Sequence, residues 1–94
     1  MKAVYKYTIA PFKNQDTVTM PVGAQIIDVK VQHDVPTIWA IVDTMPDTPK
    51  VERTFTLLPT GAAISNDMAY IDTIHINEGK ALVFHLFETS NNNG

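Results

Sequence analysis

The stretch that decides the fold class is Tyr70–Glu88, which reads YIDTIHINEGKALVFHLFE. Two runs of alternating apolar and polar residues, Tyr70–Ile76 and Lys80–Glu88, flank the turn Asn77–Lys80. Alternation with a period of two, interrupted by a glycine-containing turn, is typical of an antiparallel hairpin. With a two-residue loop at Glu78-Gly79, Ile76 is expected to face Ala81, and Ile74 is expected to face Val83.

Both faces of the predicted hairpin are apolar. One face carries Tyr70, Ile74, Ile76, Ala81, Val83 and Phe87, and the other carries Ile71, Leu82, Phe84 and Leu86. A small antiparallel sheet usually keeps one face polar and solvated, and a chain of 94 residues has little material with which to cover two faces. We therefore expect one face to form the core, and the second set to meet another copy of the chain in a homo-oligomer.

The rest of the chain shows the same period of two, without a convincing helical pattern. The other expected strands are Lys2–Ile9, Asp16–Met20, Gln25–His33, Pro36–Val42 and Lys50–Leu58. Proline and glycine residues separate them. The sequence predicts a single all-β domain over residues 1–88, an antiparallel sandwich or open barrel of about seven strands, followed by a frayed tail over residues 89–94.

Composition excludes several classes of function. The net charge of −3 argues against a protein that binds nucleic acid polymers or membrane surfaces, because both need a basic field. The chain has no cysteine, which excludes disulfides and thiolate catalysis, and no apolar run long enough to span a membrane. We expect a cytoplasmic protein without a cofactor.

The single tryptophan, Trp39, falls on the more polar side of the hairpin formed by residues 25–42. Pairing Val31 with Ile38 makes Lys30 its cross-strand neighbour. An indole beside a cation suits stacking on a planar ligand, but it suits a subunit interface or plain edge packing as well.

The single arginine, Arg53, lies on a strand face that is otherwise apolar. It is expected to lie at the sheet edge, to pair with an acid, or to hold an anion in a bidentate manner. If the protein binds an anion, the candidate ligand-binding residues are Trp39, Lys30, Arg53, Lys6, Ser65, Asn66 and Asp67. The last three belong to the long connection Pro59–Ala69, and loops of this length in small domains are often functional.

Asp72 and His85 are predicted to face each other across the last hairpin. The favoured interpretation is a structural hydrogen-bonded pair, because buried polar groups are normally satisfied in this way. A catalytic pair assisted by a loop hydroxyl is the alternative, although no nucleophile stands in a recognised motif. The three histidines lack the convergent spacing of a metal site.

Several segments form a recognisable combination: Val4–Tyr7, Val18–Ala24 followed by Ile26–Val29, Ile38–Asp43, Arg53–Phe55, Pro59–Gly61 and Leu82–Glu88. Together they resemble a family of small uncharacterised proteins of tailed bacteriophages and prophages. Family members often have Gly-His-Pro after the Thr-Gly step, where this chain has Ala62 and Ala63. The resemblance implies a phage accessory protein in the host bacterial cytoplasm, and it transfers no catalytic residue.

These observations lead to an expected function and an alternative from another class. We expect a non-enzymatic, homo-oligomeric protein that binds a small anionic ligand, such as a nucleotide immune signal, and so acts as an anti-defence sponge. The alternative is a structural or protein-interaction module, either a virion accessory piece or an inhibitor of a host protein, with no small ligand.

Overall fold

The chain folds into strands only, in the part that the structure describes. The computed structural model describes residues 1–10, 15–76 and 82–90, and no helix occurs among them. The seven strands are β1 (Lys2–Thr8), β2 (Gln15–Pro21), β3 (Gln25–Gln32), β4 (Val35–Asp43), β5 (Lys50–Pro59), β6 (Met68–Ile76) and β7 (Leu82–Thr89). The expected all-β class and the approximate strand positions are confirmed.

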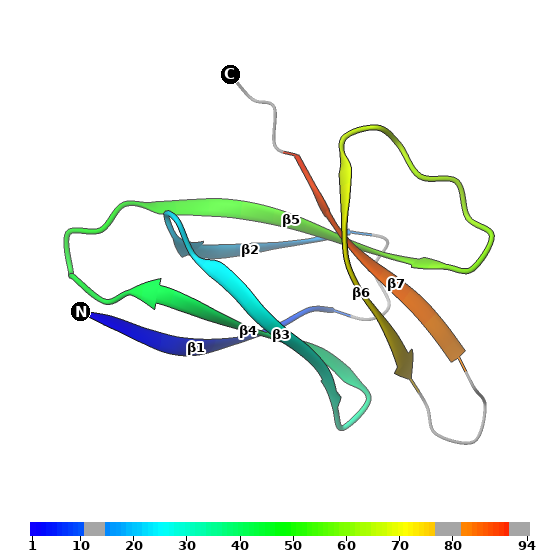
Figure 1. The fold of residues 1–94 in the computed structure, drawn as a ribbon, viewed down its shortest axis with the longest axis horizontal. Coiled ribbons are helices and arrows are strands. Elements are labelled where there is room, and N and C mark those ends of the chain that lie inside the picture. The colour runs from blue at the N-terminus through cyan, green and yellow to red at the C-terminus, as the bar shows by residue number, and fades with distance from the viewer. Residues whose placement is uncertain (11–14, 77–81, 91–94) are drawn as a thin grey trace.

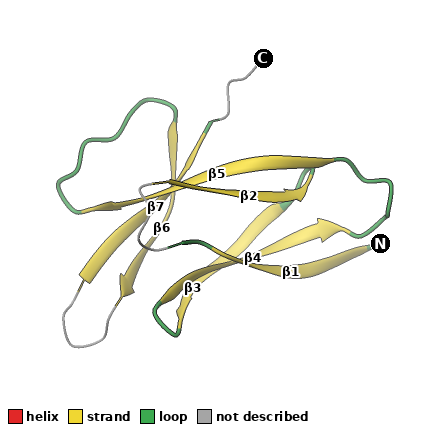
Figure 2. Cartoon of the chain, turned by 180° about the vertical axis from the view of Figure 1, so that it is seen from behind, coloured by secondary structure: helices red, strands yellow, loops and turns green. Residues whose placement is uncertain are grey.

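The strands form two antiparallel sheets (Figures 1 and 2). Sheet A has the order β1-β4-β3, and sheet B has the order β2-β5-β7-β6. The two sheets pack as separate layers and do not close into a barrel, so the architecture is a small sandwich. β4 is the central strand of sheet A, so it lies between β1 and β3.

The core lies between the two sheets and is built from the inward side chains of alternating strand residues. Sheet A contributes Ile38, Ala40 and Val42 from β4, and sheet B contributes Phe55 and Leu86, all exposed by 1% or less. Burying one large apolar side chain stabilises a fold by about 1.5–3 kcal/mol. The buried side chains of β4 therefore stabilise the packing of the two sheets.

The turn between β3 and β4 is formed by His33 and Asp34. Both residues have positive φ angles, 52° and 64°, which is the conformation of a two-residue type I′ turn. The sequence placed the turn one residue later, so the expected pairing of Val31 with Ile38 is wrong, and Val29 is the partner of Ile38 instead. The shift equals two residues, and each side chain therefore keeps its predicted face.

The alternation along β3 predicts that Ile27, Val29 and Val31 share its apolar face, and a β-bulge makes this wrong for Ile27. Ile26 pairs with Ala40 and Asp28 pairs with Trp39, so Ile27 has no partner of its own. Ile27 is 48% exposed, whereas Ile26 packs against the core. Two consecutive isoleucines fit either phase of an alternating pattern, and only the bulge decides which of them is buried.

The predicted register of the last hairpin is wrong by one residue. Ile76 pairs with Leu82 and Thr73 pairs with His85, whereas Asp72 lies opposite Leu86. The expected turn residues fall within 77–81, outside the described residues. A slip of one residue changes which side chains share a face, so the predicted Asp72–His85 pair does not form.

This register also changes the expected subunit interface. Leu86 is fully buried between the two sheets, so its assignment to an interface is wrong. Ile71 and Phe84 pack against the same core as partly buried side chains, while Leu82 is 43% exposed. Most of the side chains that were expected at the subunit interface therefore pack in the chain's own core. Self-association through them stays a prediction.

The end of the chain is ordered further than expected. β7 continues to Thr89, and the backbone N–H of Ser90 donates to the carbonyl of Asp67 at 2.8 Å. The rest of the predicted tail, residues 91–94, lies outside the described residues. Within the described ranges, no helix has the length and apolar character that crossing a membrane requires.

Candidate functional site

Trp39 lies at the centre of the outward side of sheet A. On β4 it is flanked by Lys6 of β1 on one side and by Asp28 of β3 on the other. Directly paired residues on antiparallel strands point to the same side, with Cβ atoms about 4.5–5.5 Å apart. The three side chains therefore form a row across the sheet: a cation, the indole and a carboxylate.

The neighbouring rows extend this surface. Val4 pairs with Ile41 on one side of the Trp39 row, and Lys30 lies opposite Thr37 on the other. We call this surface the Trp39 face and define it by its principal side chains, Val4, Lys6, Asp28, Lys30, Trp39 and Ile41. In the two-layer arrangement, no described strand covers it (Figure 2).

The structure corrects the expected neighbour of Trp39. Lys30 does not lie beside the indole; it is one row away, with its Nζ 3.7 Å from Oδ1 of Asp28. Both side chains of this ion pair are at least half exposed, so the pair contributes little to stability. Lys6, which the sequence grouped with the ligand residues, is the cation directly beside Trp39.

The exposure of these side chains suits the Trp39 face to binding. The indole is half-buried, Lys6 is exposed, and Val4 keeps 53% of its surface exposed. A tryptophan flanked by aliphatic side chains and rimmed by charges resembles the composition of protein interfaces, whose centres are aromatic and whose rims are charged. A cation next to an indole also suits a planar anion.

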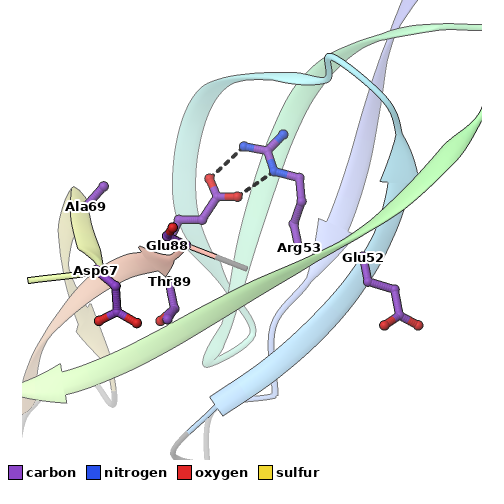
Figure 3. Close-up of a pocket in the computed structure, with 7 residues that line it drawn as sticks. Glu52, Arg53, Asp67, Ala69, Glu88 and Thr89 are labelled. Carbon is purple, nitrogen blue, oxygen red and sulfur yellow. Dashed lines mark hydrogen bonds and ion pairs between the residues drawn. The ribbon is translucent and has the colours of Figure 1, made fainter. Parts of the chain in front are cut away.

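Arg53 is engaged within the chain. Its Nε and one terminal nitrogen donate to the two carboxylate oxygens of Glu88 at 2.6 and 2.7 Å, and its other terminal nitrogen donates to the carbonyl of Ala24 at 2.6 Å. Figure 3 shows the guanidinium and the carboxylate pointing at each other above β5. Arg53 thereby links β5 and β7 of sheet B to the turn between β2 and β3.

The electrostatics of this contact stabilise the charged form of Arg53. The hydrogen bond that Arg53 donates to Glu88 raises the pKa of Arg53 above its ordinary value, against the opposing effect of burial. Of the three outcomes expected from the sequence, pairing with an acid is the one observed. The guanidinium has its bidentate side occupied by Glu88, which removes the geometry that an incoming carboxylate or phosphate would use.

A pocket of about 280 Å³ lies beside this ion pair (Figure 3). It is lined by Glu52, Arg53, Asp67, Ala69, Glu88, Thr89 and Ser90. Three of these residues are acids and the one cation is already paired, so the pocket repels anions. Arg53 and Asp67 share this pocket, but the structure does not bring Trp39, Lys6 or Lys30 to it.

The loop residues of the predicted ligand site bind mainly to one another. The hydroxyl of Ser65 donates to Oδ1 of Asp67, and the carbonyl of Ser65 accepts from the N–H of Met68. Ser65, Asn66 and Asp67 are exposed in the connection between β5 and β6, which projects beyond the sheets (Figure 1). These contacts shape the loop and do not form a ligand site with the Trp39 face.

His85 bridges hydroxyl groups on the outward side of sheet B. Its Nδ1 lies 2.9 Å from the Thr73 hydroxyl and its Nε2 lies 2.8 Å from the Thr60 hydroxyl. The Thr73 hydroxyl also contacts the Tyr70 hydroxyl at 2.7 Å. Asp72 does not take part in these side-chain hydrogen bonds, because its Oδ1 accepts from the backbone N–H of Thr73. The ring is therefore held by neutral partners.

Three residues of these clusters were missed by sequence analysis: Asp28, Glu88 and Thr60. A lone arginine on an apolar strand face signals that an acid must lie nearby, but only the register identifies Glu88. Thr60 directly follows Pro59, which pairs with Phe84, so it lies at the end of β5 beside β7. No pattern in the sequence marks Thr60 as a partner of His85.

In the described ranges, no three histidine or acidic side chains gather closely enough to hold a metal ion.

The comparisons with known proteins supply a family without an activity. No curated protein and no solved structure matches the chain. A family model matches residues 1–94, and the chain therefore belongs to the domain of unknown function DUF7352, which confirms the expected membership of a family of unknown function.

Proposed function

We propose that this protein acts by binding and that the Trp39 face is its protein-contact surface. The supporting observation is the position of Trp39, half-buried on the central strand of an uncovered sheet face, between Lys6 and Asp28. Tryptophan at the centre of a contact surface contributes a large share of binding energy, because it buries a large area with few rotatable bonds.

The surroundings of Trp39 support protein binding over a small-ligand pocket. Val4 and Ile41 extend the apolar area along the strands, and charged residues stand at its rim. The pocket lined by Arg53 and Asp67, two of the predicted anion residues, is acidic, and its arginine is already paired. A flat, mixed apolar and charged surface is typical of interaction modules.

The resemblance to proteins of tailed phages suggests where such binding would act. A phage accessory protein of this kind would meet its partner in the cytoplasm of the infected bacterium, either as a virion component or as an inhibitor of a host defence protein. This context supports an interaction module, and it rests on the resemblance alone.

The test is native mass spectrometry of tagged protein purified from bacterial cells. We expect a stoichiometric protein partner, either a second copy or another chain, that is lost in Trp39→Ala and retained in the control Tyr70→Ala, which removes an exposed aromatic side chain of sheet B. Circular dichroism establishes that both variants are folded. Purification of wild type without any bound protein, at all concentrations, would contradict the proposal.

A second candidate function is supported by the cation beside the indole. A nucleotide could stack its base on Trp39 while the ammonium group of Lys6 contacts a phosphate, as expected for an anti-defence sponge. Because the chain has a single tryptophan, its fluorescence reports on this site directly. Saturable quenching by cyclic or linear nucleotides that weakens in Lys6→Ala would support this function, and unchanged emission throughout the panel would reject it.

A further inference from the structure

The charges of the Trp39 face are arranged so that the face is complementary to itself. Lys6 stands on the β1 side of Trp39 and Asp28 stands on the β3 side, in one row across the sheet. We propose that the partner of the Trp39 face is a second copy of the same face. This inference rests on the proposed function, because it names the occupant of the proposed contact surface.

A two-fold axis parallel to β4, lying between two stacked copies, satisfies both charges at once. This rotation places β1 of one copy over β3 of the other, so Lys6 meets Asp28 of the partner subunit, and the same contact repeats symmetrically. Trp39 then stacks near the partner subunit's Trp39, because the axis runs directly over the central strand. The dimer gains two ion pairs around an aromatic centre.

The other in-plane axis is disfavoured by the same charges. A two-fold axis that is perpendicular to the strands and passes through the Trp39 row would keep β1 over β1, so Lys6 would oppose the partner's Lys6 and Asp28 would oppose the partner's Asp28. Like charges placed face to face repel, which makes this arrangement costly. For a dimer centred on Trp39, the charges of this row therefore select one orientation, in which the two copies of β4 run in the same direction, apart from the usual twist between packed sheets.

The neighbouring rows fit the selected orientation. Lys30 of one copy lies over Thr8 of the partner subunit, and Val4 lies over Gln25 of the partner subunit, since each pair occupies opposite sides of the same row. Ile41 meets its own counterpart on the axis. No two charges of the same sign meet in these two rows, whereas in the row beyond Ile41 the Asp43 side chains of the two copies face each other, each beside Lys2 of its own chain.

The size of the face sets the expected strength of the dimer. Three strands about 4.8 Å apart, rising about 3.4 Å per residue over about eight residues, present roughly 350–400 Å². Stable interfaces bury about 800 Å² per partner, so this dimer is expected to be weak and dependent on concentration. Its ion pairs make it dependent on salt as well.

The experiment combines sedimentation velocity with charge reversal. Wild type is measured from about 1 µM to about 1 mM protein in low salt, where a weak dimer is populated at the upper end. We expect Lys6→Glu and Asp28→Lys each to weaken association by about tenfold or more, and the double variant Lys6→Glu/Asp28→Lys to restore it. Restoration requires that the two residues meet across the interface, and simple misfolding cannot produce it.

The control Lys50→Glu makes the same charge change at an exposed residue of β5, away from the face, and is expected to dimerise like wild type. Unfolding midpoints establish that every variant is folded. A wild type that stays monomeric at the highest concentration overturns self-association, as does a dimer that is insensitive to the reversals or not restored by the double variant. If native mass spectrometry still finds another protein bound in a Trp39-dependent manner, the proposed function survives and only the identity of the partner is wrong.

Discussion

The chain has one arginine and one tryptophan, and the structure places them in opposite situations. Arg53, at the end of the sandwich, has its charge matched by Glu88 and a third bond to the carbonyl of Ala24. Trp39 lies on a face whose charged residues, Lys6 and Asp28, remain largely exposed. The first region is satisfied within the chain, and the second presents its chemistry outward.

This difference separates residues that hold the fold from residues available for a partner. The sequence grouped Arg53 with Trp39 in a single anion site because both are rare and distinctive. Their contacts assign them different roles: a guanidinium with a bidentate acid partner acts structurally, whereas an uncovered indole with exposed charged neighbours suits recognition. Four measurements test this distinction between residues that hold the fold and residues available for a partner.

The largest effect is expected inside the sandwich. Leu86→Ala removes a fully buried side chain from the core and should lower the free energy of unfolding by about 2–5 kcal/mol. Leu82→Ala is the matched control, because the same truncation at a 43% exposed leucine of β7 should cost less than about 1 kcal/mol. Urea unfolding measures both values. Equal losses would show that Leu82 is covered, as it would be in a hairpin-mediated oligomer.

The next effect compares two cations directly. Arg53→Ala leaves Glu88 partly buried and unpaired, and should lower the free energy of unfolding by about 2–4 kcal/mol. Lys6→Ala removes the same charge from the Trp39 face and should change it by less than about 0.5 kcal/mol in dilute protein. The separation of roles fails if the two variants are destabilised equally.

A smaller effect is expected at the turn between β3 and β4. His33 has a φ of 52°, a left-handed conformation that is unfavourable for most non-glycine residues. Asparagine adopts it at a lower cost in free energy. His33→Asn should therefore stabilise the protein by about 0.3–1 kcal/mol without altering either region of the comparison. Thermal unfolding checks the gain, and a loss of stability would indicate that the imidazole makes a contact that asparagine cannot replace.

The smallest effect appears only in alkaline solution, on the inner side of β1. Burial, with a further contribution from the charge of Tyr5, raises the pKa of Tyr7 above its usual value of 10.0. The unfolded chain therefore ionises first, so this stabilisation is full below about pH 10 and is lost as the pH rises through the folded pKa. Urea midpoints from about pH 8 to about pH 11 should fall more in wild type than in Tyr7→Phe. Parallel curves would contradict the direction of the pKa shift.

The alternation of apolar residues was sufficient to predict the strands, because a period of two is a local property of the chain. Ile38, Ala40 and Val42 are buried as their spacing requires. The bulges at Ile27 and Ile71 could not be predicted, since two adjacent apolar residues satisfy either phase of the pattern. One unpaired residue is enough to decide which side chains reach the core.

The candidate site depends on register, and register is not local. A turn placed one residue late moved the neighbour of Trp39 from Asp28 to Lys30 in the prediction, and an error of one residue paired His85 with Asp72 instead of Thr73. The residue types expected at the site were informative, but the pairs they form are set by the length and geometry of the turns.

The two bulges also bear on how copies of this chain can assemble. β3 and β6 are edge strands, one in each sheet, and each bulge interrupts the regular row of hydrogen-bonding groups that a further strand would need. On the remaining edges, β1 carries Lys2 and Lys6, and β2 ends at Pro21. Growth by adding strand to strand would produce open-ended fibres, whereas pairing through a face closes after two copies. The irregular edges thus protect a small sandwich from aggregation by strand addition, including at the high concentrations at which the proposed dimer would form.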